Sequence, residues 1–165
     1  PRQAFGTGNH HTTRMLMEWL AQANLQGLDV IDAGTGTGVL SIMCVLKGAN
    51  HVLAYDIDEW SADNARDNLL LNGIGSARVE VRLGDASVLQ PNDQAHLLMA
   101  NINRNILLAD MQRFAGALLP AGQLLLSGFY TEDIPLLTAE AARYGLHLKD
   151  KRTEDSWTML LLQKD

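Results

Sequence analysis

Three glycines alternate with other residues directly after an apolar run. The segment 30–40 reads Val-Ile-Asp-Ala-Gly-Thr-Gly-Thr-Gly-Val-Leu, so that Asp32 is followed by Gly34, Gly36 and Gly38. This pattern predicts a buried strand, a tight turn and the start of a helix. Glycine suits such a turn because it has no Cβ, adopts positive φ and lets a ligand approach the backbone closely. The free N–H groups and partial positive charge of the helix N-terminus favour an anionic or polar ligand group.

The spacing of the glycines distinguishes among the nucleotide-like ligands that such turns bind. A dinucleotide fingerprint requires Gly-x-Gly-x-x-Gly or Ala, but its last position is Val39 counted from Gly34 and Ser41 counted from Gly36. The phosphate-binding pattern Gly-x-x-x-x-Gly-Lys is absent, because no lysine follows the turn before Lys47. The remaining pattern, Asp-x-Gly-x-Gly-x-Gly, resembles the form used by S-adenosylmethionine (SAM) methyltransferases. Other nucleotides and a purely structural turn stay open as alternatives.

Two further acids follow predicted strands. Asp56 ends the strand 51–56, about 20 residues past the glycine turn, where a carboxylate can accept hydrogen bonds from ribose hydroxyls. Its alternative role is helix capping, for which Asp58 is better suited. Asp85 follows the alternating strand 77–83, where it can accept from the exocyclic amine of an adenine. A solvated turn acid is the other interpretation of Asp85.

The fourth predicted strand ends in a cluster of polar side chains. Asn101, Asn103, Arg104 and Asn105 follow the strand residues 96–100. In open parallel sheets, ligands bind outside the carboxyl ends of the strands, near the point where strand order reverses. Asn103 is suited to cap the next helix, which leaves Asn101 for chemistry.

Strand and helix signals alternate five times before a closing hairpin. The polar link 153–156 is too short for a parallel crossover, so the last two strands are expected to pair antiparallel. The fold class is therefore α/β, a doubly wound sheet of seven strands. Thr12 and Thr13 are expected at the start of the first helix, as N-caps or as ligand contacts. The predicted strands cover 28–33, 51–56, 77–83, 96–100, 123–128, 146–152 and 157–163. Helices are predicted at 38–47, 59–72 and 104–118, with a first helix that has Thr12 or Thr13 near its start and a last helix that starts at Thr131. A turn is predicted at 120–122.

Composition narrows the class of protein. The 165 residues suit one domain, which is long enough to bury roughly two-thirds of its unfolded surface. The net charge of −6 gives no reason to expect direct binding of nucleic acid. No apolar run reaches the roughly 18 residues of a membrane span, and no secretory leader is visible, so a cytoplasmic protein is expected.

Cysteine and histidine usage argues against disulfides and metals. Cys44 is the single cysteine and lies on an apolar helix face, which predicts a buried, inert thiol. His10 and His11 are adjacent and therefore point to different helix faces, and no Cys or His partners are spaced for zinc. No metal site is expected.

The chain resembles a known family in several segments that occur in register. The segments are Ala4–Thr13, Val30–Gly38, Asp56–Asp58, Ala100–Ile102 and Glu154–Trp157. Together they resemble the catalytic domain of the bacterial methyltransferase of large-ribosomal-subunit protein eleven, the PrmA family. The similarity covers nearly the whole chain.

The resemblance implies a fold, a cofactor and site residues. The fold is the Rossmann-like SAM methyltransferase fold, in which the seventh strand inserts antiparallel between the fifth and the sixth. Asn101 is the catalytic candidate, and Phe5, Ile102 and Asn103 are assigned to the substrate loop, with Phe5 and Thr7 in a loop that closes over the site. The family's cofactor contacts fall on Thr13, Gly34, Asp56 and Asn101. Together with the motif residues and the loop, the cofactor-binding candidates are Thr7, Thr13, Asp32, Gly34, Gly36, Gly38, Asp56, Ile57, Asp85 and Asn101.

Two departures from the family pattern lie beside the predicted site. The family usually has Asn-Ile-Leu-Ala where this chain has Asn101-Ile-Asn-Arg104, and proline where it has His11. Family members also carry an N-terminal domain that recruits the ribosomal protein, and nothing in 1–165 corresponds to it. The chain opens at Pro1 without an initiator methionine, which favours an excised domain over a tag-cleaved complete protein.

The predicted function is a SAM-dependent protein N-methyltransferase that acts on amino groups of a large-subunit ribosomal protein. The Asn101 side-chain oxygen and nearby backbone carbonyls are expected to accept from the amine N–H groups, so that the nitrogen lone pair faces the methyl group. Asparagine is no general base at neutral pH, so the proton is expected to pass to solvent. Another acceptor, or a SAM-binding module without catalysis, stays open; an NAD-dependent oxidoreductase is disfavoured by Val39 and Ser41.

Overall fold

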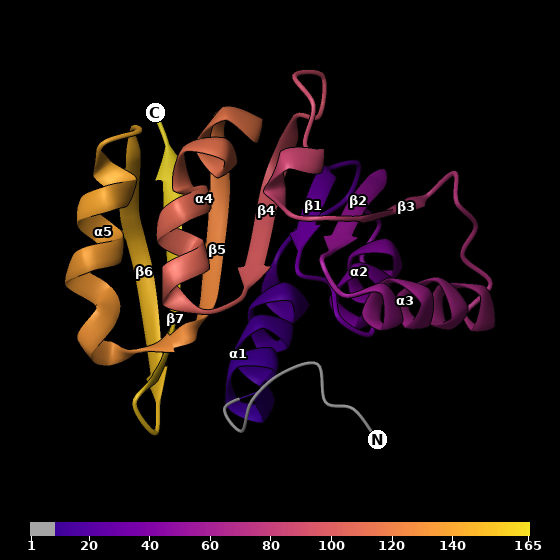
Figure 1. The fold of residues 1–165 in the computed structure, drawn as a ribbon, viewed down its shortest axis with the longest axis horizontal. Helices are drawn as coiled ribbons and strands as arrows, with labels where there is room; N and C mark the ends of the chain where they lie inside the picture. The colour runs from indigo at the N-terminus through magenta and orange to yellow at the C-terminus, as the bar shows by residue number, and fades with distance from the viewer. Residues whose placement is uncertain (1–8) are drawn as a thin grey trace.

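The protein is built on one seven-stranded sheet, which the computed structural model describes from residue 9 to residue 165, with side chains from residue 11 (Figure 1). The strand order is β3-β2-β1-β4-β5-β7-β6. Strand β7 runs antiparallel to both of its neighbours, and the other neighbouring strands are parallel. The strands are β1 Asp29–Ala33, β2 His51–Asp56, β3 Val79–Leu83, β4 Ala95–Asn101, β5 Leu118–Tyr130, β6 Leu146–Glu154 and β7 Trp157–Lys164. The predicted fold class and the position of the last strand are confirmed.

Helices cover both faces of this sheet (Figure 1). Helices α1, α2 and α3 share one apolar core with the sheet, and α4 and α5 share a second core on the other face. Successive strand residues alternate between the cores, since Val30 belongs to the first and Ile31 to the second. The helices are α1 Asn9–Gln22, α2 Val39–Leu46, α3 Glu59–Leu71, α4 Arg104–Ala117 and α5 Ile134–Ala142, with 3-10 turns η1 Ala86–Val88 and η2 Thr131–Asp133.

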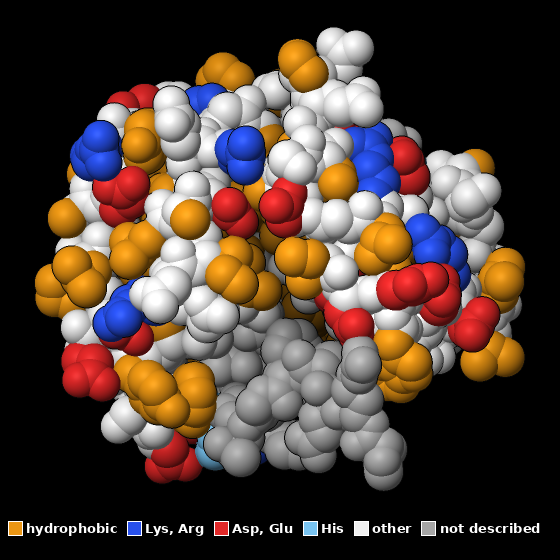
Figure 2. All heavy atoms as spheres, in the orientation of Figure 1, with side chains coloured by type: hydrophobic (Ala, Val, Ile, Leu, Met, Phe, Trp, Pro, Cys, Tyr) orange, Lys and Arg blue, Asp and Glu red, His pale blue; other side chains and the backbone are white. Residues whose placement is uncertain are grey.

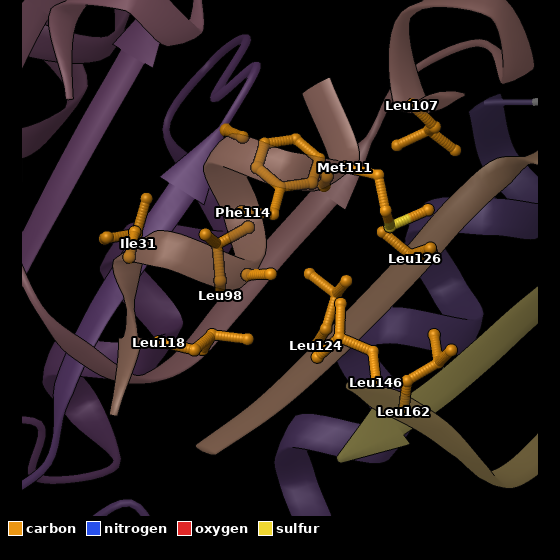
Figure 3. Packing of buried hydrophobic residues seen from close by; sticks show 14 of the residues in the cluster. Ile31, Leu98, Leu107, Met111, Phe114, Leu118, Leu124, Leu126, Leu146 and Leu162 are labelled. Atoms are coloured by element: carbon orange, nitrogen blue, oxygen red, sulfur yellow. The ribbon is translucent and has the colours of Figure 1, made fainter. Parts of the chain in front are cut away.

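The larger core joins α4 to the middle of the sheet. Figure 3 shows Phe114 and Met111 of α4 packed among strand residues such as Leu98 and Leu124. All four side chains are fully buried. Truncating a buried phenylalanine to alanine costs about 3–5 kcal/mol, so this core fixes α4 firmly against β4 and β5.

Strand order reverses between β1 and β4, the two central strands. Strand β1 pairs with β2 on one side and with β4 on the other, with Ala33 opposite Ala100. The loops after β1 and β4 therefore leave the sheet side by side and continue to α2 and α4 on opposite faces. Such a switch point is where open α/β sheets bind ligands.

Two helices begin at the caps that the sequence predicts. Asp58 accepts from the Ser61 backbone N–H at 3.2 Å at the start of α3. Asn103 accepts from the Ile106 N–H at 3.1 Å at the start of α4. Helix α3 ends at Leu71 with Asn72 as its C-cap, and Gly73 follows with a φ of 71°, as the Asn-Gly pair predicts.

Three local predictions were wrong. Helix α1 already begins at Asn9, so Thr12 and Thr13 lie inside the helix and are not its N-caps. The segment 120–122 is an irregularity within β5, where the pairing with β4 shifts register and Ala121 adopts a φ of 64°. Residues 131–133 form a 3-10 turn, and helix α5 starts only at Ile134. At 120–122, long-range strand pairing overrides the local residue preference.

Candidate active site

The glycine turn after β1 is shaped by positive φ angles. Gly34, Gly36 and Gly38 adopt φ values of 73°, 57° and 84°. Backbone N–H groups of Gly34 and Thr35 both donate to the Tyr55 carbonyl, at 2.9 and 3.0 Å. A Cβ on Gly34 would lie 2.7 Å from Cγ2 of Ile102. The turn therefore requires glycine at position 34 for two reasons, its φ angle and the close approach of Ile102.

Asp32 lies beneath this turn and is 2% exposed. Its Oδ2 accepts from the hydroxyl of Thr35 at 2.8 Å and from the hydroxyl of Ser41 at 2.7 Å. Burial raises the pKa of this carboxyl, and the two hydroxyl hydrogen bonds oppose that rise. Asp32 thus joins β1, the turn and α2, and the sequence motif alone did not reveal these two partners.

Asp56 connects the loops that follow β1 and β2. Its Oδ2 accepts from the Gly36 N–H at 2.9 Å, and its Oδ1 accepts from the Asp58 N–H at 2.9 Å. A carboxylate oxygen has more than one lone pair, so both oxygens can still accept from a ligand. Asp56 therefore lies at the rim of the glycine turn with a fixed carboxylate, where a ribose was expected.

An apolar surface lies next to Asp56 at the ends of β2 and β3. Ile57 is 74% exposed and Leu83 is 50% exposed, and Leu83 is opposite Asp56 in the sheet register. The Gly84 N–H donates to the Asp56 carbonyl at 2.8 Å, which holds the two loops together. Sequence analysis did not identify Leu83 as a site residue. The signal that could have identified it is an apolar residue at the very end of a strand, close to two acidic residues.

Asp85 follows this apolar surface and is exposed. Its Oδ1 accepts from the backbone N–H of Ser87 at 2.9 Å and from the Ser87 hydroxyl at 2.5 Å. These bonds lower the pKa of Asp85, so the side chain is a carboxylate acceptor at neutral pH. Leu83 and Ile57 with Asp85 thus offer a flat apolar surface and an acceptor, which suits the face and the exocyclic amine of a base.

Asn101 lies at the end of β4 and is 4% exposed. Its Nδ2 donates to Oγ1 of Thr13, a residue of α1, at 3.3 Å. Since the amide nitrogen faces Thr13, the side-chain oxygen is the atom that can accept from a substrate. The structure thus brings Thr13 and Asn101 together, as the resemblance implied, although they are 88 positions apart in the sequence.

The backbone after Asn101 is packed tightly. The Ile102 N–H donates to the Ser127 carbonyl at 3.1 Å. A Cβ on Gly128 would lie 2.6 Å from the Ile102 carbonyl oxygen, and the φ of Gly128 is 98°. Ile102 therefore contacts the neighbouring strand on one side and Gly34 on the other, and it links the two predicted loops.

The first turn of α4 carries the departures from the family pattern. The side chain of Asn103 caps the helix. Nη1 of Arg104 donates to Oδ1 of Asp133 at 3.1 Å, and Oδ2 of Asp133 accepts from the Tyr130 N–H at 3.0 Å. Asp133 is buried, so the guanidinium is held over the end of β5. Sequence analysis did not predict this ion pair.

A second polar cluster joins α1 to the turn between β6 and β7. Nδ1 of His11 lies 2.9 Å from Oε1 of Glu154, and Arg14 contacts the same oxygen. The described residues contain no group of three or more His, Cys, Asp or Glu side chains that could hold a metal ion. Phe5 and Thr7, which were also predicted to belong to the site, lie outside the described residues.

The surface shows no concentration of positive charge on the face drawn in Figure 2. Lys and Arg side chains on this face are scattered among acidic and apolar ones. Among the helices of the described residues, none is both long and apolar enough to cross a bilayer.

Comparison with known families gives this geometry a context. The family model described as ribosomal protein L11 methyltransferase (PrmA) matches residues 1–165. The chain belongs to this family. It is 47% identical, over 165 residues, to a ribosomal protein L11 methyltransferase of Porphyromonas gingivalis. A relative of the same name from Phocaeicola vulgatus is 42% identical over 157 residues.

The chain spans about half the length of these relatives. The matches cover 100% and 95% of the chain, but only 56% and 55% of the two relatives. Among solved structures, a ribosomal protein L11 methylase from Lactobacillus delbrueckii subsp. bulgaricus superposes with a TM-score of 0.87 at 30% identity. That superposition covers 96% of this chain and 81% of the solved one. The fold of this PrmA-family chain is thus the α/β methyltransferase fold.

Proposed function

We propose that residues 1–165 form one catalytic domain that binds SAM and transfers its methyl group to amino groups of a large-subunit ribosomal protein. One observation carries this proposal: a positive-φ glycine turn, the carboxylate of Asp56 and the buried amide of Asn101 meet at the switch point of the sheet. The names of the relatives, which specify ribosomal protein L11, support the choice of acceptor.

The residues present fit SAM in three respects. The positive φ angles of the glycine turn bend the backbone sharply at the switch point, where open α/β sheets bind their ligands. Asp56 offers a fixed carboxylate to ribose hydroxyls, and hydrogen bonds to a charged group contribute about 1.5–3 kcal/mol each. Ile57 and Leu83 offer an exposed apolar surface to the adenine, and Asp85 offers an acceptor for its exocyclic amine.

The chain itself acts mainly by positioning the acceptor amine. When bound, SAM supplies an electrophilic methyl group attached to a sulfonium. The Oδ1 atom of Asn101 accepts from an N–H of the amine, because Nδ2 is turned toward Thr13. This bond directs the nitrogen lone pair toward the methyl group, and such orientation contributes on the order of 7–11 kcal/mol.

The proton of the amine passes to solvent in this mechanism. The Asn101 amide is neutral and is no base at neutral pH, and the carboxyl of Asp32 is buried beneath the turn and bonded to two hydroxyls. Repeated methylation of one nitrogen then requires only rotation of the amine. No second catalytic group is needed for each further methyl group.

A second candidate function keeps SAM but changes the acceptor. Arg104 places a half-exposed guanidinium next to Asn103, held there by the buried Asp133. Such a charge favours an acceptor with a carboxylate or carbonyl near its amine. Another protein or a small molecule with that feature is the alternative substrate.

The partners and the location follow from the proposed acceptor. A ribosomal-protein substrate places the reaction in the cytoplasm. The net charge of −6 gives no support for direct binding of nucleic acid.

Mass spectrometry of the ribosomal protein tests the proposal. Ribosomal protein L11 is incubated with SAM and with either the 165-residue chain or the protein at its full natural length. The expected result is a mass increase by whole methyl groups at amino groups, and a much smaller increase over the same time with the Asn101→Ala variant. Calorimetry with SAM and with NAD runs in parallel, and binding of NAD instead of SAM would overturn the proposal.

A further inference from the structure

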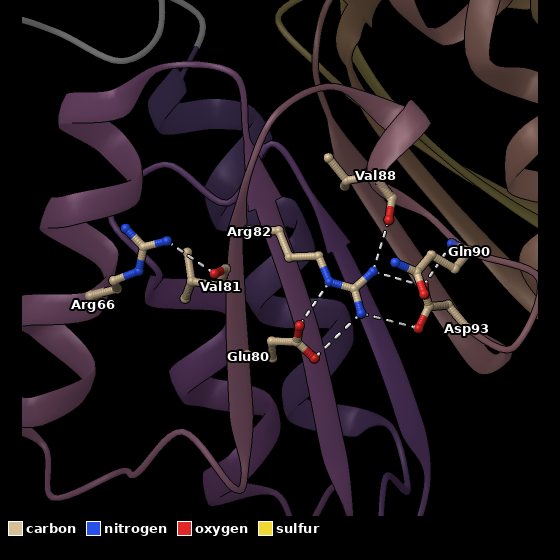
Figure 4. Close-up of polar contacts among 7 residues, drawn as sticks. All are labelled: Arg66, Glu80, Val81, Arg82, Val88, Gln90 and Asp93. Atoms are coloured by element: carbon tan, nitrogen blue, oxygen red, sulfur yellow. Dashed lines mark hydrogen bonds and ion pairs between the residues drawn. The ribbon is translucent and has the colours of Figure 1, made fainter.

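Arg82 of β3 is the centre of a polar network at the edge of the sheet (Figure 4). Its Nε donates to Oε2 of Glu80 at 2.8 Å, on the same strand. Its Nη1 donates to Oδ2 of Asp93 at 2.7 Å and to the carbonyl of Val88 at 2.8 Å. The side chain is only 21% exposed, so these bonds form in a partly desolvated setting.

The bonds from Arg82 to Val88 and to Asp93 reach the loop that carries Asp85. Val88 is the last residue of η1, and the cap of η1 is Asp85. The Val88 N–H donates to the Asp85 carbonyl at 3.1 Å, so the two residues form one turn. Asp93, at the other end of the loop, accepts from the Gln90 N–H at 2.7 Å. Arg82 therefore bonds this loop at two points, five residues apart in the sequence.

Apolar packing alone does not fix the direction of this turn. Ala86 is fully buried, and Val88 and Leu89 pack against the core beside it. Burial of this kind is non-directional, because it depends on the apolar area removed from water. The planar fork of a guanidinium, in contrast, sets distances and angles to each partner.

The opposite charges of Arg82 and its partners Glu80 and Asp93 stabilise this network. Burial raises the pKa of Asp93, but the bonds from Arg82 and from the Gln90 N–H outweigh it, so that the pKa lies below its usual value. Glu80 and Asp93 both raise the pKa of Arg82. The guanidinium thus keeps its charge and its two carboxylate partners across the physiological range.

We infer that Arg82 is a positioning residue for recognition of the adenine base. It holds η1 so that the carboxylate of Asp85, beside Leu83 and Ile57, faces the exocyclic amine. This inference rests on the proposed function, because it requires that SAM binds at this edge of the sheet.

Arg66 provides a matched control. It lies on α3, next to the same strand, and its Nη2 donates to the Val81 carbonyl at 3.0 Å (Figure 4). Its Nη1 donates to Oδ1 of Asp63, on its own helix, at 3.1 Å. Arg66 thus shares the residue type, the charge and the neighbouring strand with Arg82 but has no bond to the loop of Asp85 among the described residues.

The experiment compares two ligands that differ at the recognised group. Calorimetry measures the Kd of S-adenosylhomocysteine, which is SAM without its methyl group, and of its inosine analogue, in which oxygen replaces the exocyclic amine. The wild type is expected to prefer the adenine form about tenfold, as expected for one hydrogen bond to a carboxylate. Arg82→Met is expected to lower this preference to about twofold, whereas Arg66→Met retains it.

A third variant and the wild-type result distinguish failure of this inference from failure of the proposed function. Arg82→Lys, which keeps the charge but not the fork, is expected to show an intermediate preference, and it decides the question if Arg82→Met does not fold. If Arg82→Lys and Arg82→Met both keep the full preference for the adenine form, the inference is overturned. If Arg82→Met is unfolded, full preference in Arg82→Lys alone overturns it. In both cases the binding of SAM still stands. Wild-type protein that binds neither ligand would overturn the proposed function itself.

Discussion

The two halves of the sheet's carboxyl edge are held in shape by different kinds of contacts. In the cofactor half, defined by 34–38, 56–57 and 83–85, these segments are joined to one another by backbone hydrogen bonds and by the Asp56 carboxylate, which receives backbone N–H groups. The side chains of Asp32 and Arg82, which lie outside these segments, support the glycine turn and the turn of Asp85. The acceptor half, defined by 101–104 and 130–133, depends on side-chain contacts between distant segments. Because backbone bonds tolerate changes of side chain, the cofactor half can stay constant while the acceptor half changes its substrate.

One of the two departures from the expected family pattern, at Asn103 and Arg104, lies in the acceptor half, and the glycine turn keeps the full motif. The other, His11, lies on α1 in neither half, next to Glu154. Substitutions in the two halves should therefore have separable effects. Those in the cofactor half should change the Kd of SAM, and those in the acceptor half should change turnover or the KM of the acceptor.

The largest effect is expected from Asn101→Ala. Loss of the side-chain oxygen removes the group that orients the amine, and a misplaced nucleophile lowers kcat by about 100-fold. The Kd of SAM should stay within about threefold, because Asn101 acts on the acceptor. Steady-state kinetics with L11 and calorimetry with SAM measure the two quantities. Asn105→Ala, on the exposed first turn of α4, is the control, and unchanged turnover in Asn101→Ala would refute the catalytic role.

Asp56→Ala should give the next largest effect, confined to the cofactor half. Removal of the carboxylate takes away hydrogen bonds to ribose that contribute about 1.5–3 kcal/mol each, so the Kd of SAM should rise about thirtyfold. Asp56→Asn keeps one acceptor oxygen and should lie between the two. Calorimetry measures all three proteins. A Kd that is the same in Asp56→Ala as in the wild type would show that the ribose binds elsewhere.

Arg104→Ala should have a smaller effect, confined to the acceptor half. The guanidinium is half-exposed, and contacts of exposed charges contribute about 0.2–1 kcal/mol, so the KM of the acceptor should rise by at most about fivefold. The Kd of SAM should not change. Arg104→Lys keeps the charge and serves as the control for the loss of the Asp133 partner. A change in SAM affinity without a change in acceptor KM would contradict the separation of the two halves.

The smallest effect concerns pH and Asp32. Because its pKa is raised in the folded protein, the folded state takes up this proton before the unfolded state does. The contribution of Asp32 to stability is therefore lowest above the folded pKa and grows as the pH falls toward the unfolded value near 3.8. One such group changes the free energy of unfolding by at most about 1.4 kcal/mol per pH unit.

Urea unfolding of the wild type and of Asp32→Asn checks this sign. The difference between their free energies of unfolding, wild type minus variant, should increase as the pH is lowered from neutrality toward 4. The variant has no titrating group at this position and provides the baseline for the other carboxylates. A difference that decreases over this range would show that the folded protein stabilises the carboxylate form of Asp32.

Sequence analysis predicted well what short-range rules determine. The glycine turn, the caps at Asp58 and Asn103 and the end of α3 at Gly73 depend on residues within a few positions of each other. The position of β7 between β5 and β6 came from the family resemblance, because no local pattern specifies the order of strands.

Contacts between distant segments escaped prediction. The ion pair of Arg104 with Asp133 and the bond of Arg82 to Asp93 join elements whose proximity only the fold creates. That Thr13 and Asn101 lie at one site was implied by the family resemblance, and only the hydrogen bond between them was not predicted. The irregularity at Ala121 was predicted as a turn, because the signals of a bulge and of a turn are the same residue types.

A crystal structure with S-adenosylhomocysteine bound tests the central claim most directly. The account predicts the ribose at Asp56, the adenine between Ile57 and Asp85, and the sulfur directed toward the side-chain oxygen of Asn101. Ligand density at another place, or a glycine turn covered by side chains with no ligand in it, would contradict the account.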